Sequence, residues 1–323
     1  MNHIILFTLI SFFISMVSYS LILPIFKLLK FSQPINEEAP KNHKKKTGVL
    51  TMGGIIFILS SVLLSMIFLG YKNVEVLICI LSLLLFGAVG FIDDVLKICG
   101  RHNKGLSPFQ KLVLLIIVSS FLSFFTYFNP SISKEIFIPF IPRFLNLGIY
   151  YIPFTLFFYL STTNAVNLTD GVDGLVTTLI LIILTFFTVI SIITNHYNLA
   201  LFSSILCGSL LGFLKFNSYP AKIIMGDTGS LALGGIISSI ALILNLQITI
   251  LIVGLIFVIE VLSVIIQVIF FKITGRKLFP MTPIHHSFEL KGWHESKILS
   301  LFSIITLILC LICTLIINKY MLI

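Results

Sequence analysis

Charged residues are scarce in this chain. Of its 323 residues, 10% are Asp, Glu, Lys or Arg and only twelve are acidic, whereas 58% are hydrophobic and the mean hydropathy is +1.12. A soluble domain could not cover its surface with so few polar side chains. We therefore predict an all-α integral membrane protein, with the bilayer as the solvent for most of its surface.

Long polar linkers are also missing, because ten apolar runs of roughly the length of a membrane-spanning helix fill the chain. They predict one polytopic membrane domain over residues 1–323. The run from 229 to 271 is long enough for one segment, but Asn245, Gln247 and the total length favour two spans and a short hairpin. The ten predicted spans cover about 4–29, 49–70, 74–96, 109–128, 149–166, 174–194, 199–216, 229–246, 248–271 and 298–317.

Basic residues predict the orientation of these spans, since cytoplasmic loops are enriched in Lys and Arg. The first run has no basic residue before Lys27, unlike a signal peptide, and Lys27 and Lys30 at its end favour an outside N-terminus. Ten spans then return the C-terminus to the outside, and 17 of the 21 basic residues lie inside. The predicted cytoplasmic loops are 31–48, 97–108, 167–173, 217–228 and 272–297.

The net charge of +9 mainly reflects this topology, with attraction to anionic lipids or substrates as a second interpretation. Nothing further in the sequence favours nucleic-acid binding. Five cysteines are scattered in or beside apolar runs. Cys310 and Cys313 form a C-x-x-C pattern inside the last span, where a packing role is favoured over zinc or redox chemistry.

Acidic residues gather at the predicted cytoplasmic ends of spans. Asp93 and Asp94, Asp170 and Asp173, and Asp227 belong to three different loops. Ionisable groups at membrane depth are costly and indicate function, although helix capping is the alternative for any one of them. We predict that a fold brings the three loops together at one membrane face.

The spacing within these loops suits metal and nucleotide chemistry. In GFIDDVLK (90–97), Asp93 and Lys97 are i,i+4, so a cation can lie beside paired carboxylates that bind metal or accept a proton. In NAVNLTDGVDGL (164–175), Asn167, Asp170 and Asp173 follow at i, i+3 and i+6. Their hard oxygen atoms suit magnesium with a nucleotide better than zinc.

Three further segments contribute candidates. Asp227 precedes an apolar run, so it either caps that helix or lies where the helix amides receive a phosphate; the pattern is not a Walker A loop. His285 and His286 sit in MTPIHHSFELKGWHE (281–295), where phosphate or sugar contacts are favoured over zinc. Glu260, inside the ninth predicted span, should face the bundle interior, either in an interhelical hydrogen bond or lining the site.

The segments TMGG, GFIDDVLK, NAVNLTDGVDGL, MGDTGSLALGG and PIHHSFELKGW occur in this order over roughly residues 43–297. Together they resemble the polyprenyl-phosphate N-acetylhexosamine-1-phosphate transferases, and the last segment resembles their muramoyl-pentapeptide branch. The resemblance implies Mg²⁺-dependent transfer of phospho-N-acetylmuramoyl-pentapeptide from UDP-N-acetylmuramoyl-pentapeptide to undecaprenyl phosphate, which yields lipid I and UMP. It also implies that the protein is a homodimer embedded in the lipids of the bacterial cytoplasmic membrane, with an active site that faces the cytoplasm. A short β-hairpin is implied outside the membrane between spans four and five, and residues 136–154 are the candidate for it.

The resemblance also assigns residues. Asp93, Asp94 and Asp227 match catalytic acids, and Asp227 with Asp93 would hold the metal. Three positions depart from the family pattern: Val49-Leu50 replaces Thr-Pro, Ile224 replaces a Phe that packs on uracil, and Ser287 replaces a third His. The predicted substrate-binding residues are Lys46, Lys97, Lys111, Asn167, Asp170, Asp173, Asn217, Ile224, Gln267, His285 and His286.

Asp93 is our candidate for accepting a proton from undecaprenyl phosphate, so that the phosphate attacks directly. A two-step route with an Asp nucleophile is the alternative mechanism. A UDP-N-acetylglucosamine transferase is the rival within the class. A transporter is the rival outside it, but a transporter should carry its acids deep within the spans.

Overall fold

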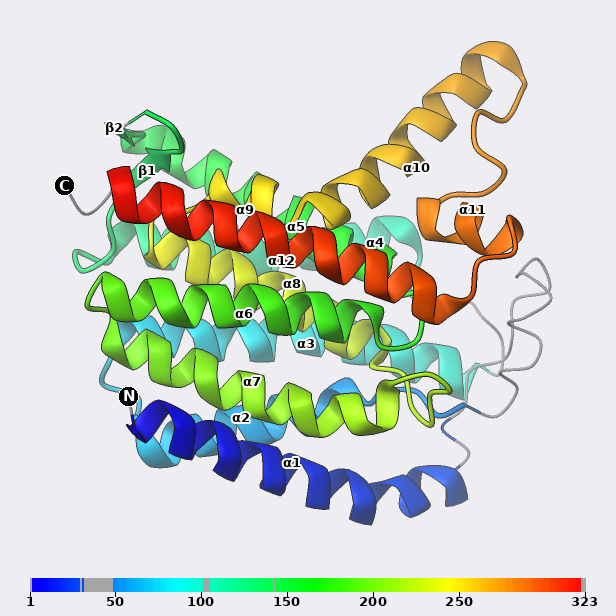
Figure 1. The fold of residues 1–323 in the computed structure, drawn as a ribbon, viewed down its shortest axis with the longest axis horizontal. Coiled ribbons are helices and arrows are strands. Elements are labelled where there is room, and N and C mark those ends of the chain that lie inside the picture. The colour runs from blue at the N-terminus through cyan, green and yellow to red at the C-terminus, as the bar shows by residue number, and fades with distance from the viewer. Residues whose placement is uncertain (1, 30, 32–48, 101–104, 142, 321–323) are drawn as a thin grey trace.

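The computed structural model describes residues 2–29, 31, 49–100, 105–141 and 143–320, and most of these residues are helical (Figure 1). Within these ranges, eight helices are long and apolar enough to cross a membrane, which makes the chain a multi-pass membrane protein. They are α1 (Asn2–Leu28), α3 (Val74–Cys99), α4 (Pro108–Phe128), α6 (Leu175–Ile193), α7 (Tyr197–Asn217), α8 (Gly226–Ile243), α10 (Leu255–Thr274) and α12 (Glu295–Tyr320).

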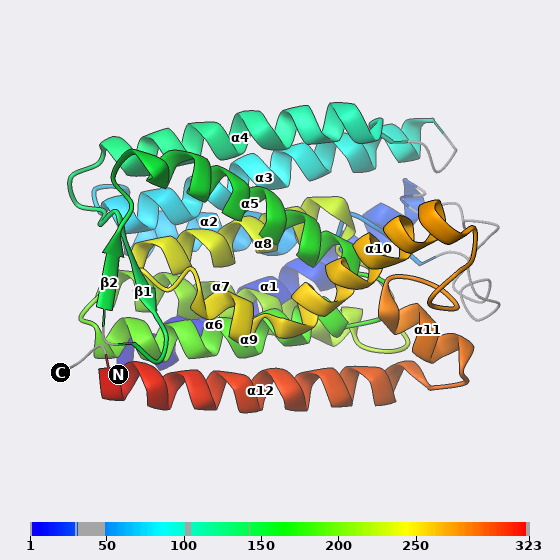
Figure 2. The same cartoon turned by 90° about the horizontal axis from the view of Figure 1, so that it is seen from above.

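Two more helices correspond to predicted spans, but one is too short and the other is not apolar enough to count as a membrane-spanning helix. Helix α2 (Gly54–Phe68) has only 15 residues, and α5 (Tyr151–Thr169) is 19 residues long but rich in Thr and Asn near its end. Ten spans therefore stay a prediction, as do the sides on which the termini lie. Helices α1 and α12 respectively begin and end at the same end of the bundle, where the strands also lie (Figures 1 and 2).

The ninth predicted span, 248–271, is wrong as a single helix. It is divided into α9 (Thr249–Val253) and α10 at Gly254, whose amide donates to the Ile250 carbonyl at 2.8 Å and closes α9. Helix α10 then leans away from the bundle, with α11 (Ile284–Leu290) beside its far end (Figure 1). The turn expected near Asn245 is present, because α8 ends at Ile243 and Asn245 has a φ of 61°.

A two-stranded antiparallel sheet, β1 (Glu135–Ile138) and β2 (Arg143–Asn146), lies between α4 and α5, followed by a short turn, η2 (Gly148–Tyr150). Its register pairs Glu135 with Asn146 and Ile138 with Arg143. The Phe137 amide donates to the Asn245 carbonyl at 2.9 Å, which ties the sheet to the turn after α8.

Helix α8 is the centre of the bundle. It is 18 residues long, 94% of these residues are buried, and it packs against α3 and α5. Its small residues permit this close packing, as at Gly235, which lies against the Phe86 ring. The first turn of α8 carries Asp227. The central position of α8 therefore brings Asp227 next to the ends of α3 and α5.

Candidate active site

Helices α3 and α8 pack backbone against backbone at Gly90. A Cβ added to Gly90 would overlap the carbonyl of Asp227, so a side chain here would push the two backbones apart. Asp93 and Asp94 follow within one turn on α3. The contact thus places the two acids of α3 against the first turn of α8.

Asp94 caps α8 from the neighbouring helix. Its Oδ1 accepts the Asp227 amide at 3.1 Å, and its Oδ2 accepts the Thr228 amide at 2.9 Å and the Thr228 hydroxyl at 2.7 Å. A carboxylate that satisfies the free amides at a helix start stabilises that start. Asp94 is fully buried, and both its oxygen atoms are used in this way.

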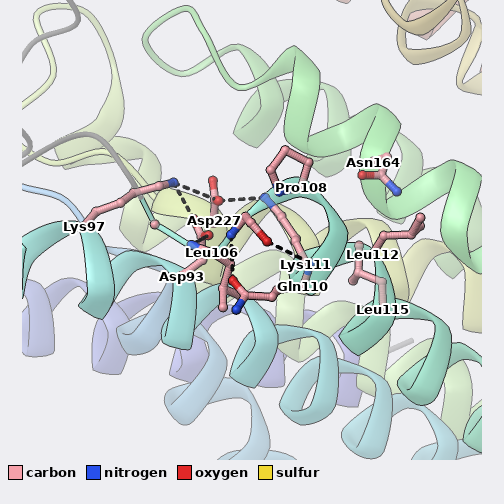
Figure 3. A pocket seen from close by; sticks show the side chains of 12 residues that line it. Asp93, Lys97, Leu106, Pro108, Gln110, Lys111, Leu112, Leu115, Asn164 and Asp227 are labelled. Atoms are coloured by element: carbon pink, nitrogen blue, oxygen red, sulfur yellow. Dashed lines mark hydrogen bonds and ion pairs between the residues drawn. The ribbon is translucent and has the colours of Figure 1, made fainter.

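Asp227 is the centre of an ion-pair cluster at the cavity surface (Figure 3). Its Oδ2 lies 2.9 Å from Lys97 Nζ and 2.8 Å from Lys111 Nζ, and Lys97 Nζ also lies 2.5 Å from Asp93 Oδ2. The side chains of Asp227, Lys97 and Lys111 are 17–20% exposed, so the cluster is reachable from the cavity. The predicted i,i+4 pairing of Asp93 with Lys97 is confirmed.

Asn167, near the end of α5, completes the cluster. Its side-chain amide donates to Asp227 Oδ1 at 2.9 Å and to the Ser230 hydroxyl at 2.8 Å, and its Oδ1 accepts from Lys111 at 3.3 Å. Asn167 therefore fixes the rotamer of Asp227 from α5.

A cavity of about 880 Å³ opens onto this cluster between α3, α4 and α5. The charged groups form one part of its wall, and Leu112 and Leu115 form another (Figure 3). This combination of a charged end and an apolar wall fits a ligand that joins a phosphate to a hydrocarbon chain. The lining residues are Asp93, Lys97, Gly105, Leu106, Ser107, Pro108, Gln110, Lys111, Leu112, Leu115, Asn164 and Asp227.

Several of these lining residues were not predicted from the sequence. The Leu106 amide donates to Asp93 Oδ1 at 2.8 Å, a backbone contact that leaves no mark on residue type. Ser107 and Gln110 form a capping box that begins α4, and the S-x-x-Q spacing was a readable signal for it. Asn164 lies one turn before Asn167, so its helical spacing was a signal as well.

The cluster fits a hard divalent cation. Carboxylate oxygen atoms from Asp93, Asp94 and Asp227 lie within 4.8 Å of one another, and oxygen is the donor that Mg²⁺ prefers. Three carboxylates face two ammonium groups, which leaves one formal negative charge uncompensated in the cluster. Asp227 and Asp93 line the cavity, whereas Asp94 is fully buried and does not, so Asp227 and Asp93 are the residues that could hold the metal.

The next predicted residues brace the loops around the cavity. Asp173 is 5% exposed, and its Oδ2 accepts the Ala221 amide at 2.9 Å. Asn217 accepts from the Thr177 hydroxyl at 2.7 Å and donates to the Ile223 carbonyl at 3.0 Å. Asp170 is half-buried directly after α5. None of Asp170, Asp173 and Asn217 is among the cavity-lining residues.

The remaining predicted residues lie farther along the same end of the bundle. The Ile224 amide donates to the Leu50 carbonyl at 2.8 Å, so two of the departures from the family pattern pair with each other. Gln267 Oε1 accepts the amides of residues 278 and 279 at 3.0 and 2.9 Å. His286 Nδ1 lies 2.6 Å from Glu289, and His285 is fully buried. Lys46 lies outside the described residues.

Residues 76–245 match the sequence profile of glycosyl transferase family 4. The chain belongs to this family. It is 51% identical over 312 residues to a phospho-N-acetylmuramoyl-pentapeptide-transferase of Clostridium novyi (strain NT), covering 97% of this chain and 96% of the relative. Proteins of the same name from Clostridium kluyveri (strain NBRC 12016) and Clostridium botulinum (strain Alaska E43 / Type E3) are 48% and 52% identical, covering 97% and 94% of this chain and 98% and 93% of the relatives. The glycosyl transferase family 4 match includes Asp93, Asp94, Asn167 and Asp227.

Proposed function

We infer that the chain is a phospho-N-acetylmuramoyl-pentapeptide transferase and catalyses the step that forms lipid I. The observation that carries this inference is the identity of about 50% to proteins of that name over nearly the whole chain. We propose UDP-N-acetylmuramoyl-pentapeptide as the donor and undecaprenyl phosphate as the acceptor. The cavity supports this choice, because phosphate groups suit its lysine end and a polyprenyl chain suits Leu112 and Leu115.

Phosphoryl transfer depends on positioning and on neutralising charge more than on covalent chemistry. In the proposed mechanism, Lys97 and Lys111 bind oxygen atoms of the donor pyrophosphate. Asn167 holds Asp227 in the orientation that keeps both lysines in place. Donors fixed before the reaction stabilise developing charge without reorganisation.

Asp93 is the proposed proton acceptor. Its side chain lines the cavity, and the Leu106 amide and Lys97 fix its two oxygen atoms. Removal of a proton from the acceptor phosphate frees an oxygen that attacks the β-phosphorus of the UDP-sugar, and UMP leaves. We propose that Asp227 and Asp93 hold Mg²⁺, which would neutralise the pyrophosphate and the departing UMP when bound.

We also propose that this end of the bundle faces the cytoplasm of a bacterial cell, where UDP-sugars are made. The positive-inside distribution of Lys and Arg supports this orientation. An outside location for the β1–β2 hairpin follows from the same assignment.

The test is a transfer assay with purified full-length protein, undecaprenyl phosphate and Mg²⁺, in which the lipid product is identified by mass. UDP-N-acetylmuramoyl-pentapeptide should give lipid I and UMP, and EDTA should abolish the reaction. A product formed only from UDP-N-acetylglucosamine would replace the proposed donor, and no lipid product from either donor would refute the function.

A further inference from the structure

A buried carboxylate near the start of α10 contacts His285 of α11. Glu260 on α10 is fully buried, and its Oε1 lies 3.2 Å from Nδ1 of His285, which is also fully buried. Its Oε2 accepts the His285 backbone amide at 3.4 Å. Burial of a carboxylate without a partner is costly, so this pairing fixes both the side chain and the backbone of His285 relative to α10.

The other edge of the His285 ring lies against Gly171. A Cβ added to Gly171 would overlap Nε2 of His285, so only glycine allows this contact. Gly171 follows Asp170 in the turn between α5 and α6 that also carries Asp173. Glu260 therefore reaches the turn 170–174 through the imidazole of His285.

The segment from α11 to α12 holds the same turn at a second point. Glu295 Oε2 accepts the Asp173 amide at 3.1 Å, while Asp173 in turn accepts the Ala221 amide. Contacts from His285 and Glu295 thus support the turn at Gly171 and at Asp173. The position of the turn depends on where α10 holds the His285 segment.

We propose that Glu260 is a positioning residue for the sugar-nucleotide side of the site: through His285 and Gly171 it sets the position of the turn carrying Asp170 and Asp173. The proposal rests on the proposed function for its substrate. Neither Glu260, His285 nor the turn 170–174 is among the residues that line the cavity, where Leu112 and Leu115 form the wall proposed for the polyprenyl chain. Loss of Glu260 should therefore affect the donor more than the polyprenyl phosphate.

Two substitutions at Glu260 separate position from charge. Glu260→Gln keeps the size of the side chain, and its carbonyl can still accept the His285 amide, so the kinetics should stay close to normal. In Glu260→Leu both contacts are lost. Because small misplacements of binding groups cost up to about a hundredfold, kcat/KM for the UDP-sugar should fall about ten- to a hundredfold, with KM for undecaprenyl phosphate changed less than about threefold.

Ser263→Ala is the matched control for Glu260. Ser263 is buried one turn farther along α10, and its hydroxyl donates to the Glu260 carbonyl of its own helix. Its kinetics should equal those of the unmodified protein. Equal losses for both substrates in Glu260→Leu, or a loss in Glu260→Gln as large as in Glu260→Leu, would overturn the positioning role.

Hydrogen exchange of the full-length protein tests the same claim without any substrate. Peptides over 168–175 should exchange at least about tenfold faster in Glu260→Leu than in the unmodified protein, Glu260→Gln or Ser263→Ala, because the turn loses its support. Unchanged exchange in Glu260→Leu would refute the proposal. Failure of the transfer assay in the unmodified protein would refute the proposed function alone and leave this measurement decisive.

A double-mutant cycle tests the contact between Gly171 and His285. Gly171→Ala should lower Tm and weaken UDP-sugar use, whereas the same change in a His285→Ala background should have a smaller effect, since the ring that the methyl group meets is gone. Gly235→Ala is the control, because its added methyl group meets the Phe86 ring away from the turn. It should give additive effects with His285→Ala. Additivity for Gly171 and His285 would contradict the contact.

Discussion

Asp94 holds Asp227 through the backbone: its Oδ1 accepts the Asp227 amide at 3.1 Å, while the Asp227 carboxylate points into the cavity toward Lys97 and Lys111. Adjacent acids on α3 therefore have different tasks. Asp93 faces the cavity, whereas Asp94 fixes the start of α8. The two acids should therefore respond differently to substitution.

Asp227→Asn should lower turnover at least about a hundredfold, the scale of losing a major electrostatic group in an active site. Asn keeps the size of the side chain but removes the charge that pairs with two lysines. The rate of lipid product formation across a Mg²⁺ titration measures the effect. Near-normal turnover with unchanged Mg²⁺ dependence would contradict the assignment, and Tm should change little because Asp94 still caps α8.

Asp94→Ala should lower both Tm and turnover. The variant leaves the amides of Asp227 and Thr228 without their acceptor, and loss of a helix cap typically costs about 0.5–2 kcal/mol. Thermal unfolding in detergent, compared with Asp227→Asn, measures the difference. A variant with normal Tm but no activity would indicate that Asp94 acts directly on the substrate.

Gly90→Ala should destabilise the protein by about 1–3 kcal/mol, as overpacking of a close-packed interior does. Its methyl group would overlap the backbone of Asp227, which cannot move aside as a side chain can. Gly87→Ala is the control one turn earlier, where the nearest atom is the terminal methyl of Ile58 at 3.1 Å. Equal Tm values for the two variants would show that α3 and α8 can separate without cost.

Asp173→Ala should weaken binding of the UDP-sugar or UMP about ten- to a hundredfold. The change removes the acceptor of the Ala221 amide, and a buried group left unpaired costs about 1–3 kcal/mol. The loss should come through the turn, since Asp173 does not line the cavity. Titration with each substrate separates the effects, and equal weakening of both substrates with a falling Tm would reject a role on the nucleotide side.

Local patterns in the sequence predicted much of the site. The i,i+4 spacing of Asp93 and Lys97 predicted their pairing. The clustering of acids at span ends predicted that Asp93 and Asp94 meet Asp227, whereas Asp170 and Asp173, which were predicted to join them, do not line the cavity. The positions of Asp93 and Asp94 in the sequence do not show which of the two carboxylates faces the cavity. Asp94 can cap α8 only because α3 and α8 lie in contact, although Asp94 and Asp227 are 133 residues apart in the sequence. That contact depends on the absence of a side chain at Gly90.

The division of the ninth span was not predictable from hydropathy either. Gly254 lies within an uninterrupted apolar run, and its effect is visible only where α9 ends and α10 changes direction. The family resemblance supplied Gln267 and Asn217 as site positions. Gln267 accepts backbone amides of residues 278 and 279, and Asn217 contacts the Thr177 hydroxyl and the Ile223 carbonyl. A list of residue types does not distinguish such contacts within the protein from contacts with a ligand.

The cap between α3 and α8 also bears on how the protein is made. Asp94 leaves the ribosome 133 residues before Asp227, so the helix with the paired acids enters the membrane before the helix start that it holds. Lys97 is synthesised with them and supplies Asp93 with a counter-charge during this interval. Arrival of α8 is then the event that fills the space left at Gly90 and gives Asp94 its partners. The ion-pair cluster around Asp227 can therefore be completed only after α8 has been synthesised.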